Sequence, residues 1–164
     1  MESHPDRKPF LQGQVALVTG SARRSGSAMV RALAAAGATV VVNGRRSHEA
    51  AEALTRELQQ AHGAQRALTC MADASNEAEV AAMMQKIIDR CGRLDILVNN
   101  AVLRKHGPLQ DFSLADWHAV MSSSLDAAFL CAKHAAPHLA RAGAGRIINL
   151  GGAASQVPAR CGAA

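Results

Sequence analysis

The stretch Val15-Ala-Leu-Val-Thr-Gly-Ser-Ala-Arg-Arg-Ser-Gly26 indicates a strand, a tight turn and the start of a helix. Val15–Val18 is a short apolar run with β-branched residues at both ends, which favours a buried strand over a helix. From Ser25 apolar residues recur at helical spacing as far as a stop at Gly37. A strand that turns directly into a helix aims free backbone N–H groups and the positive end of the helix dipole at the turn. The stretch therefore predicts a site for a phosphate.

The alternation of strand and helix patterns continues along the chain. The further strands are expected at 38–43, 66–71, 94–98 and 145–150, and residues 102–113 indicate a loop. A second helix is expected from the N-cap Ser47 to Gly63, a third is capped by Ser75 and stopped by Gly92, and a long one spans 114–142. Pro137 should bend or loosen the end of that long helix.

Near-continuous apolar strands that alternate with helices are typical of a parallel sheet covered on both faces. We therefore predict an α/β fold, a Rossmann-type doubly wound parallel sheet, with strand order 3-2-1-4-5 in the part present and helices on both faces. Residues 1–13 are expected to be a flexible lead-in, and residues 14–164 a single dinucleotide-binding domain.

Composition narrows the classes of partner. The net charge is +5, but the Lys and Arg residues are scattered and aromatic residues make up only 2%, so nucleic-acid binding is not expected. The four cysteines are far apart, which indicates reduced thiols and neither a disulfide framework nor a metal site. His134 and His138 have helical spacing without a third ligand, so no metal is expected. Without a signal peptide or a membrane-spanning apolar run, we expect a cytoplasmic protein.

Polar and glycine-containing clusters follow the expected strands. These clusters are Gly20–Gly26, Asn43–Ser47, Asp73, Asn99-Asn100 and Gly151-Gly152. Each one alone is consistent with an ordinary turn or cap. Because the carboxyl ends of parallel strands meet at one edge of the sheet, the five together favour a cofactor groove at that edge.

The second strand indicates which dinucleotide the groove prefers. The acid that would bind the ribose hydroxyls of NAD is missing, since Gly44 stands at its place and Arg45 and Arg46 follow. A guanidinium can hold a 2′-phosphate through two hydrogen bonds, so NADP(H) is preferred and NAD(H) stays an alternative. The competing interpretation is a pair of solvent-exposed turn arginines.

Several motifs resemble the short-chain dehydrogenase/reductase family. Thr19-Gly20-x-x-x-Arg24-x-Gly26 resembles the family's TGxxxGxG turn in its pteridine-reductase-like form, with Arg24 at the middle Gly. Asn99-Asn100-Ala101 resembles the NNAG motif, with Val102 at its Gly, and Gly145-Arg-Ile-Ile-Asn149 resembles the strand before the catalytic serine. The resemblance implies these cofactor-binding residues: Gly20, Ala22, Arg23, Arg24, Ser25, Gly26, Arg45, Arg46, Ser47, Asp73 (toward the adenine), Asn100, Ala101 and Val102.

The resemblance also implies an NADP(H)-dependent oxidoreductase that transfers hydride between the nicotinamide and a small-molecule carbonyl or alcohol. Ser124 and Gly152 stand at the family's catalytic Asn and Ser positions, and the YxxxK segment would begin just after Ala164. We therefore expect a domain that is incomplete at its C-terminal end. The alternative is a non-catalytic NADP(H)-binding or regulatory protein of the same family. Family members commonly pair through the helix at 114–142, which implies a homo-oligomer.

Overall fold

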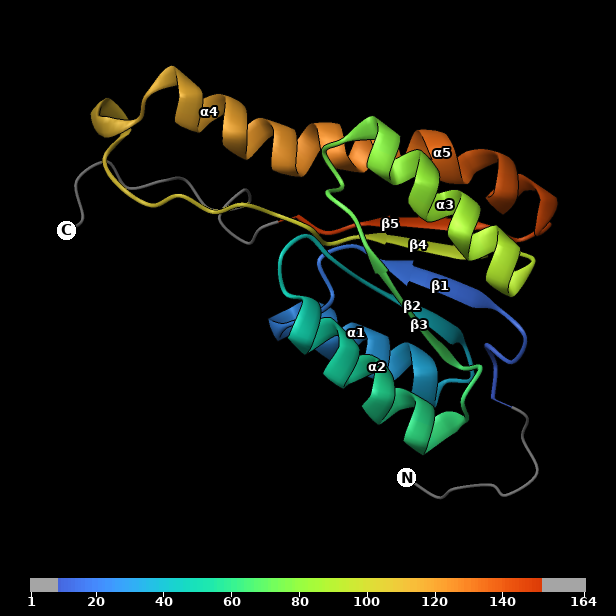
Figure 1. Cartoon of the computed structure of the whole chain (residues 1–164). Helices are drawn as coiled ribbons and strands as arrows, with labels where there is room; N and C mark the ends of the chain where they lie inside the picture. Colours follow the sequence, from blue (N-terminus) through green and yellow to red (C-terminus); the bar gives the residue numbers. More distant parts are fainter. Residues whose placement is uncertain (1–8, 152–164) are drawn as a thin grey trace.

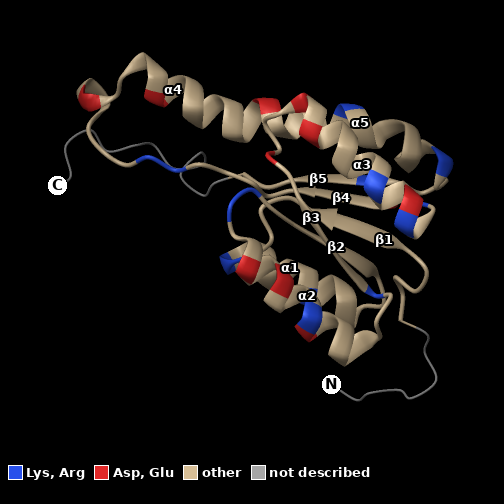
Figure 2. Ribbon diagram, viewed as in Figure 1, with Lys and Arg blue, Asp and Glu red and all other residues tan. Residues whose placement is uncertain are grey.

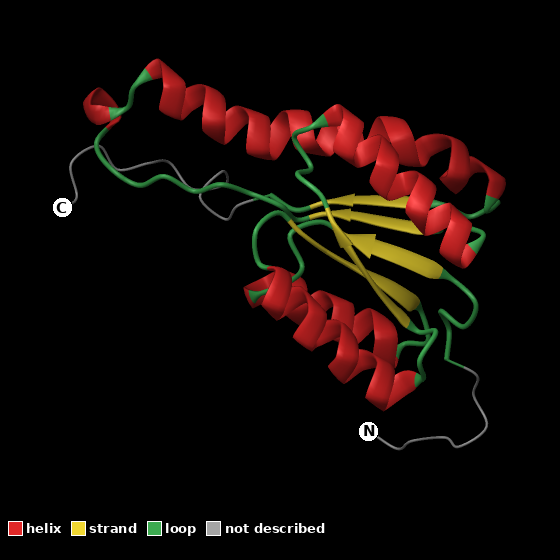
Figure 3. Ribbon diagram, in the orientation of Figure 1, coloured by secondary structure: helices red, strands yellow, loops and turns green. Residues whose placement is uncertain are grey.

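A computed structural model describes residues 9–151, and its centre is a parallel sheet of five strands between two layers of helices (Figures 1 and 3). The strand order is β3-β2-β1-β4-β5, as the sequence predicts. The strands are β1 (Val15–Val18), β2 (Thr39–Gly44), β3 (Ala67–Met71), β4 (Ile96–Asn99) and β5 (Arg146–Asn149). The helices are α1 (Arg24–Ala35), α2 (His48–His62), α3 (Glu77–Cys91), α4 (Leu114–Met121) and α5 (Ala127–Arg141), with a short 3₁₀ turn, η1, at Leu109–Asp111 and a π-helical turn, η2, at Ser122–Asp126.

The central strand β1 contributes to both cores because successive side chains of a strand point to opposite faces. Val15 and Leu17 pack in the core beneath α3 and α5, whereas Ala16 and Val18 pack in the core beneath α1 and α2. Figure 1 shows the two helical layers on opposite faces of the sheet. All four residues of β1 are buried, which explains why this strand is continuously apolar rather than alternating.

The helix starts differ from the sequence prediction in one place. The third helix, α3, is capped by Asn76, whose side chain accepts a hydrogen bond from the backbone N–H of Glu79, so the prediction of Ser75 as its cap was wrong. Ser75 instead donates its hydroxyl and backbone N–H to Asp73. Ser47 lies at the predicted N-cap of α2 but makes no capping hydrogen bond through its side chain.

The predicted helix at 114–142 is interrupted at a different point from the one expected. The chain stays helical past Pro137 to Arg141, and the irregular part is the π-helical turn η2. Pro137 lies on the exposed side of α5, where water can bind the carbonyl that loses its N–H partner. Figure 1 shows α4 projecting beyond the edge of the sheet, while α5 lies over it.

The described ends of the chain contribute little to the sheet. The backbone N–H of Leu11 donates to the carbonyl of Ala36 at 3.0 Å, which ties the segment before β1 to the end of α1. Residues 1–8 of the predicted lead-in, and Gly152 with the residues after it, lie outside the described part of the chain. Among residues 9–151, none of the helices combines the length and apolar character needed to cross a bilayer.

Gly26 lets the first turn of α1 pack directly against the turn that follows β1. A Cβ atom at this position would lie 2.7 Å from the side-chain nitrogen of Asn100, the carbonyl oxygen of Gly20 and the Cα of Ser21. Two of these three atoms belong to the backbone, which cannot move aside without shifting the turn. The start of α1 therefore requires a glycine for close packing rather than for an unusual backbone angle.

Gly26→Ala should lower the free energy of unfolding by about 1–3 kcal/mol, the usual cost of overpacking a tight site. Urea denaturation followed by circular dichroism measures this difference. Gly44→Ala is the matched control, since its Cβ would meet only the side chains of Ala22 and Met71, at 3.4 Å or more. Equal losses in the two variants would contradict the argument.

Candidate functional site

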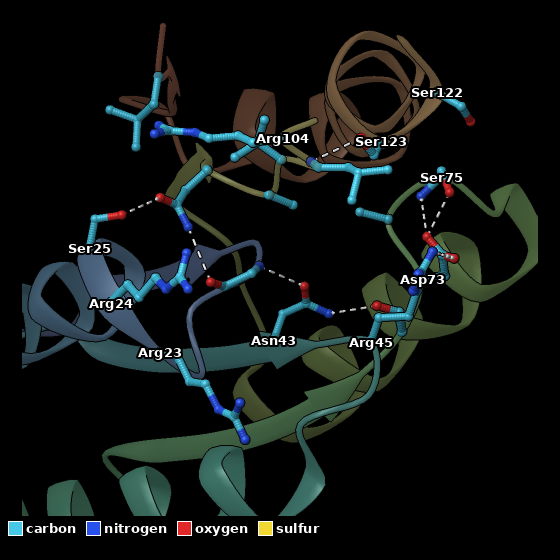
Figure 4. Close-up of a pocket in the computed structure, with 18 of the residues that line it drawn as sticks. Arg23, Arg24, Ser25, Asn43, Arg45, Asp73, Ser75, Arg104, Ser122 and Ser123 are labelled. Atoms are coloured by element: carbon cyan, nitrogen blue, oxygen red, sulfur yellow. Dashed lines mark hydrogen bonds and ion pairs between the residues drawn. The ribbon is translucent and has the colours of Figure 1, made fainter. Parts of the chain in front are cut away.

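A groove of about 1010 Å³ runs along the carboxyl edge of the sheet, where the sequence predicts a cofactor site (Figure 4). Its walls come from the loops after β1, β2, β3, β4 and β5 and from the α4–η2 segment. The lining residues include Gly20, Arg23, Arg24, Ser25, Asn43, Arg45, Asp73, Ser75, Asn100, Ala101, Val102, Leu103, Arg104, Ser122, Ser123 and Leu150. A volume of this size suits a ligand as large as a dinucleotide.

The N-terminus of α1 opens into this groove without a capping group. Arg23 is the N-cap residue and makes no side-chain capping hydrogen bond, and the first turn of α1 contains no acidic residue. The unsatisfied N–H groups and the positive end of the helix dipole thus face the groove beside Arg23 and Arg24. This arrangement fits an anionic group such as a phosphate.

Arg24 adopts a backbone conformation that glycine usually occupies. Its φ angle is +52°, the only positive value at a non-glycine residue in the described part of the chain. The turn therefore keeps the left-handed conformation although a side chain replaces the glycine of the motif. The strain this causes is a local cost, and the gain is a guanidinium on the wall of the groove.

Thr19 joins the turn after β1 to the segment after β4. Its hydroxyl oxygen accepts the backbone N–H groups of Asn100 and Ala101, each at 3.0 Å, and its hydroxyl lies 3.4 Å from the carbonyl of Val98. The side-chain amide of Asn100 in turn donates to the carbonyls of Thr19 and Gly20, and its oxygen accepts from Ser25 at 3.3 Å. Asn100 thus holds the loop in place from within the groove.

Asn43 performs the corresponding task on the other side of β1. Its side-chain oxygen accepts the backbone N–H of Gly20 at 3.0 Å, while its amide nitrogen donates to the carbonyls of Cys70 and Ala72. Asn43 is only 2% exposed, so these contacts are made away from water, where an unpaired amide would be costly. The asparagine therefore links the ends of β1, β2 and β3.

The arginine that follows β2 is paired within the groove. Nη1 of Arg45 lies 3.1 Å from Oδ2 of Asp73. Burial alone would raise the pKa of Asp73, but hydrogen bonds from Ser75 and Arg45 outweigh it, so the pKa of this carboxyl lies below its usual value. Asp73 is therefore a carboxylate at neutral pH. Figure 2 shows the basic β2–α2 and β4–α4 loops near the same edge of the sheet.

The groove brings together most of the residues that the sequence singles out. Nine of them line it, namely Gly20, Arg23, Arg24, Ser25, Arg45, Asp73, Asn100, Ala101 and Val102. Ala22, Gly26, Arg46 and Ser47 do not, and Gly26 acts from beneath the turn by allowing close packing. Ser124 lies in η2 and outside the lining, and Gly152 lies outside the described residues.

Ser123 and Arg104 are two of the lining residues that sequence reasoning missed. The hydroxyl of Ser123, in η2, accepts the backbone N–H of Leu103 at 3.0 Å and donates to the carbonyl of Val120 at 3.0 Å. The resemblance aligns Ser124, the next residue of η2, with the family's catalytic Asn and assigns no role to Ser123. Arg104 belongs to a segment without periodicity, so no sequence pattern gives the direction of its side chain.

Burial raises the pKa of the three described thiols, Cys70, Cys91 and Cys131. Cys70 and Cys131 are free, and burial raises the pKa of each thiol to about 11, so both are protonated and unreactive at neutral pH. Residues 9–151 hold no cluster of three or more His, Cys, Asp or Glu side chains suited to a metal ion. His134 contacts the carboxylate of Glu77 at 3.2 Å. Cys161 lies outside the described residues.

Comparison with known proteins extends over nearly the whole sequence. Residues 14–164 match the family described as short chain dehydrogenase. A 3-oxoacyl-[acyl-carrier-protein] reductase of Synechocystis sp. is 40% identical over 140 residues, which cover 85% of this chain and 56% of that protein. A D-beta-hydroxybutyrate dehydrogenase of Cupriavidus necator is 39% identical over 141 residues, or 86% of this chain and 54% of that protein. The chain thus spans little more than half the length of these relatives.

Several solved structures have the same fold and a related sequence. A gluconate 5-dehydrogenase from Burkholderia cenocepacia, in complex with NADP and tartrate, matches with a TM-score of 0.83 and 37% identity over 92% of this chain and 58% of that one. A metagenomic short-chain oxidoreductase in complex with NADP matches with a TM-score of 0.83 and 37% identity over 93% of this chain and 68% of that one.

Arg24→Gly should raise the free energy of unfolding by about 0.5–1 kcal/mol, because glycine adopts the left-handed conformation without strain. Arg23→Gly is the control: Arg23 has an extended backbone with φ of −148°, so glycine relieves nothing there and only adds freedom to the unfolded chain. Urea denaturation of the three proteins gives the comparison. A less stable Arg24→Gly variant would show that the side chain contributes more than its backbone costs.

Proposed function

Since this chain belongs to the short-chain dehydrogenase/reductase family, we propose that it is the NADP(H)-binding part of an oxidoreductase acting on a carbonyl or alcohol. The observation that carries the proposal is the groove at the carboxyl edge of the sheet, with an uncapped helix N-terminus and arginines on its walls. Residues 14–164 form the proposed dinucleotide-binding domain.

The turn after β1 is proposed to hold the two bridging phosphates of the cofactor. A Cβ atom at Gly20 would lie 3.0 Å from the Cα of Ala101, so a side chain there would crowd this part of the groove. The free N–H groups of α1 then donate to phosphate oxygens, and the guanidinium groups of Arg23 and Arg24 balance the charge. No acidic side chain in the first turn of α1 opposes this binding.

Arg45 and Arg46 are proposed to select NADP(H) over NAD(H). Arg45 is half-exposed and already lies at the groove, where its partner Asp73 holds it beside the end of β3. A 2′-phosphate offers this arginine a doubly charged partner, and Arg46 follows in the same loop. Asp73 is proposed to contact the adenine of the cofactor. The nicotinamide side is proposed to lie against Asn100, Ala101 and Val102.

Bound NADP(H) supplies or accepts the hydride of the proposed reaction. The residues of this chain bind and orient the cofactor, and the loop after β4 forms a wall beside the reacting region. Ser124 and Gly152 stand where the resemblance expects an asparagine and a serine. These two features favour the second candidate, a non-catalytic NADP(H)-binding protein. Turnover of a carbonyl substrate by the full-length protein would exclude it.

The chain should bind NADPH at least about tenfold more tightly than NADH, since a charge-assisted arginine–phosphate contact contributes about 1.5–3 kcal/mol. The double variant Arg45→Gln/Arg46→Gln should lose this preference by binding NADPH more weakly while leaving NADH affinity nearly unchanged. Isothermal titration calorimetry with both dinucleotides measures the two affinities for each protein.

The double variant Arg56→Gln/Arg90→Gln is the matched control for this titration. Arg56 and Arg90 are exposed on α2 and α3, away from the groove, so their loss removes two charges without touching the site. A similar drop in NADPH affinity in the control would mean that net charge, not a local contact, sets the preference. Absence of saturable binding of either dinucleotide to the unaltered chain would refute the proposed function.

A homo-oligomer is proposed to form through α4, η2 and α5. Four large apolar side chains along this path are exposed: Leu114 (69%), Trp117 (54%), Leu125 (61%) and Phe129 (63%). Apolar side chains that gather on neighbouring turns are typical of a surface that meets another protein. In a symmetric pair the same face of a second copy would cover them.

Leu125→Glu/Phe129→Glu should shift the protein toward monomer, because burying two carboxylates in an apolar contact is unfavourable. Sedimentation velocity at micromolar concentration reports the change. Phe10→Glu provides the control, as Phe10 is 80% exposed and precedes β1, far along the chain from this surface. A purely monomeric unaltered protein would count against the proposed interface.

A further inference from the structure

Among residues 9–151, Arg104 is the one arginine lining the groove that the proposed cofactor contacts do not use. Arg23 and Arg24 belong to the turn that faces the phosphates, and Arg45 is paired with Asp73. Arg104 lies across the groove from them, on the segment between β4 and α4 (Figure 4). Within residues 9–151 no carboxylate pairs with it.

Lys105, the residue after Arg104, is paired with a carboxylate. Lys105 forms an ion pair with Asp116, with Nζ 2.5 Å from Oδ2, and its ammonium lies 5.5 Å from the ring centroid of Phe112. Hydrogen bonds from Lys105 and Ser113 lower the pKa of Asp116 to about 2, and the ion pair turns Lys105 toward the start of α4. The two adjacent cations thus have different surroundings, and only Arg104 lines the groove.

The backbone that carries Arg104 is held in place from two sides. Ser123 accepts the backbone N–H of Leu103, the residue just before Arg104, and the Lys105 ion pair fixes the residue just after it. Thr19 fixes the start of the same segment through the N–H groups of Asn100 and Ala101. A cation whose backbone is anchored on both sides is presented to a ligand at less entropic cost than one on a free loop.

The surroundings of Arg104 differ from those of the phosphate turn. Val102 and Leu103 precede Arg104 in the same segment, Leu150 follows β5, and all three line the groove. Apolar walls with a single arginine suit a small organic anion whose carbon skeleton lies against the walls. A planar guanidinium binds a carboxylate through two parallel hydrogen bonds.

We infer that Arg104 is a specificity-determining residue that binds a carboxylate of the substrate, so that the substrate is an oxo acid or the corresponding hydroxy acid. This inference rests on the proposed function, because it places the substrate beside the bound dinucleotide. The carboxylate orients the molecule, and the carbonyl or alcohol carbon is the atom that exchanges the hydride. Ser123 acts as a positioning residue through the backbone N–H of Leu103.

The test compares the affinities of hydroxy acids and of their neutral amides for the chain loaded with NADPH. NADPH and a hydroxy acid are both reduced, so the complex does not react. Lactate, malate and mandelate are titrated alongside lactamide, malamide and mandelamide, and ligand-observed NMR measures the affinities. At least one acid should bind about tenfold to a hundredfold more tightly than its amide, the range of a charge-assisted hydrogen-bonded pair. Arg104→Gln should abolish that difference, and Arg104→Lys should retain part of it.

The controls separate this inference from the proposed function. Arg56→Gln should leave both acid and amide binding unchanged, and NADPH affinity should be the same in Arg104→Gln as in the unaltered chain. If NADPH binds but acids and amides bind alike, or if Arg104→Gln weakens both alike, the inference is overturned and the proposed function stands. If NADPH does not bind to the unaltered chain, the proposed function fails and the inference fails with it.

Discussion

The hydroxyl group of Thr19 is the contact on which the groove depends. It receives two backbone N–H groups from the segment after β4, so the turn after β1 and that segment cannot move independently. Asn43, on β2, makes the matching link by accepting the N–H of Gly20 and donating to the carbonyls of Cys70 and Ala72 at the end of β3. Both side chains are 2% exposed, which keeps water from competing for these hydrogen bonds. These hydrogen bonds join the segments that follow β1, β2, β3 and β4 into one continuous wall of the groove.

Charge is distributed along that wall in a way that matches a long ligand with distinct parts. Arg45 forms an ion pair with Asp73 at one side of the groove. Arg23 and Arg24 line the groove at the turn, beside the uncapped N-terminus of α1. On the other side Arg104 stands among apolar residues. Arg24, one of these cations, has a strained positive φ, so its guanidinium lies at the groove at a cost in backbone energy.

Much of this could be predicted from residue patterns, and the errors have physical causes. Strand and helix positions follow from apolar periodicity, and the stop at Gly92 follows from its left-handed φ of +73°. The cap of α3 was wrongly assigned to Ser75 instead of its neighbour Asn76, because Ser, Asn and Asp cap equally well and the choice depends on which side chain is engaged elsewhere. Pro137 stays within α5 because it faces solvent, which sequence periodicity does not reveal.

The sequence by itself determined the doubly wound sheet, its strand order and the edge of the sheet where the groove lies, because these depend on local propensity and on rules that govern all parallel sheets. Only the tertiary structure decided that Arg45 meets Asp73, that Ser123 holds the loop after β4, and that Arg104 lines the groove. The first two are contacts between segments far apart in the sequence. Their geometry depends on how helices and loops pack, and no pattern within one segment encodes it.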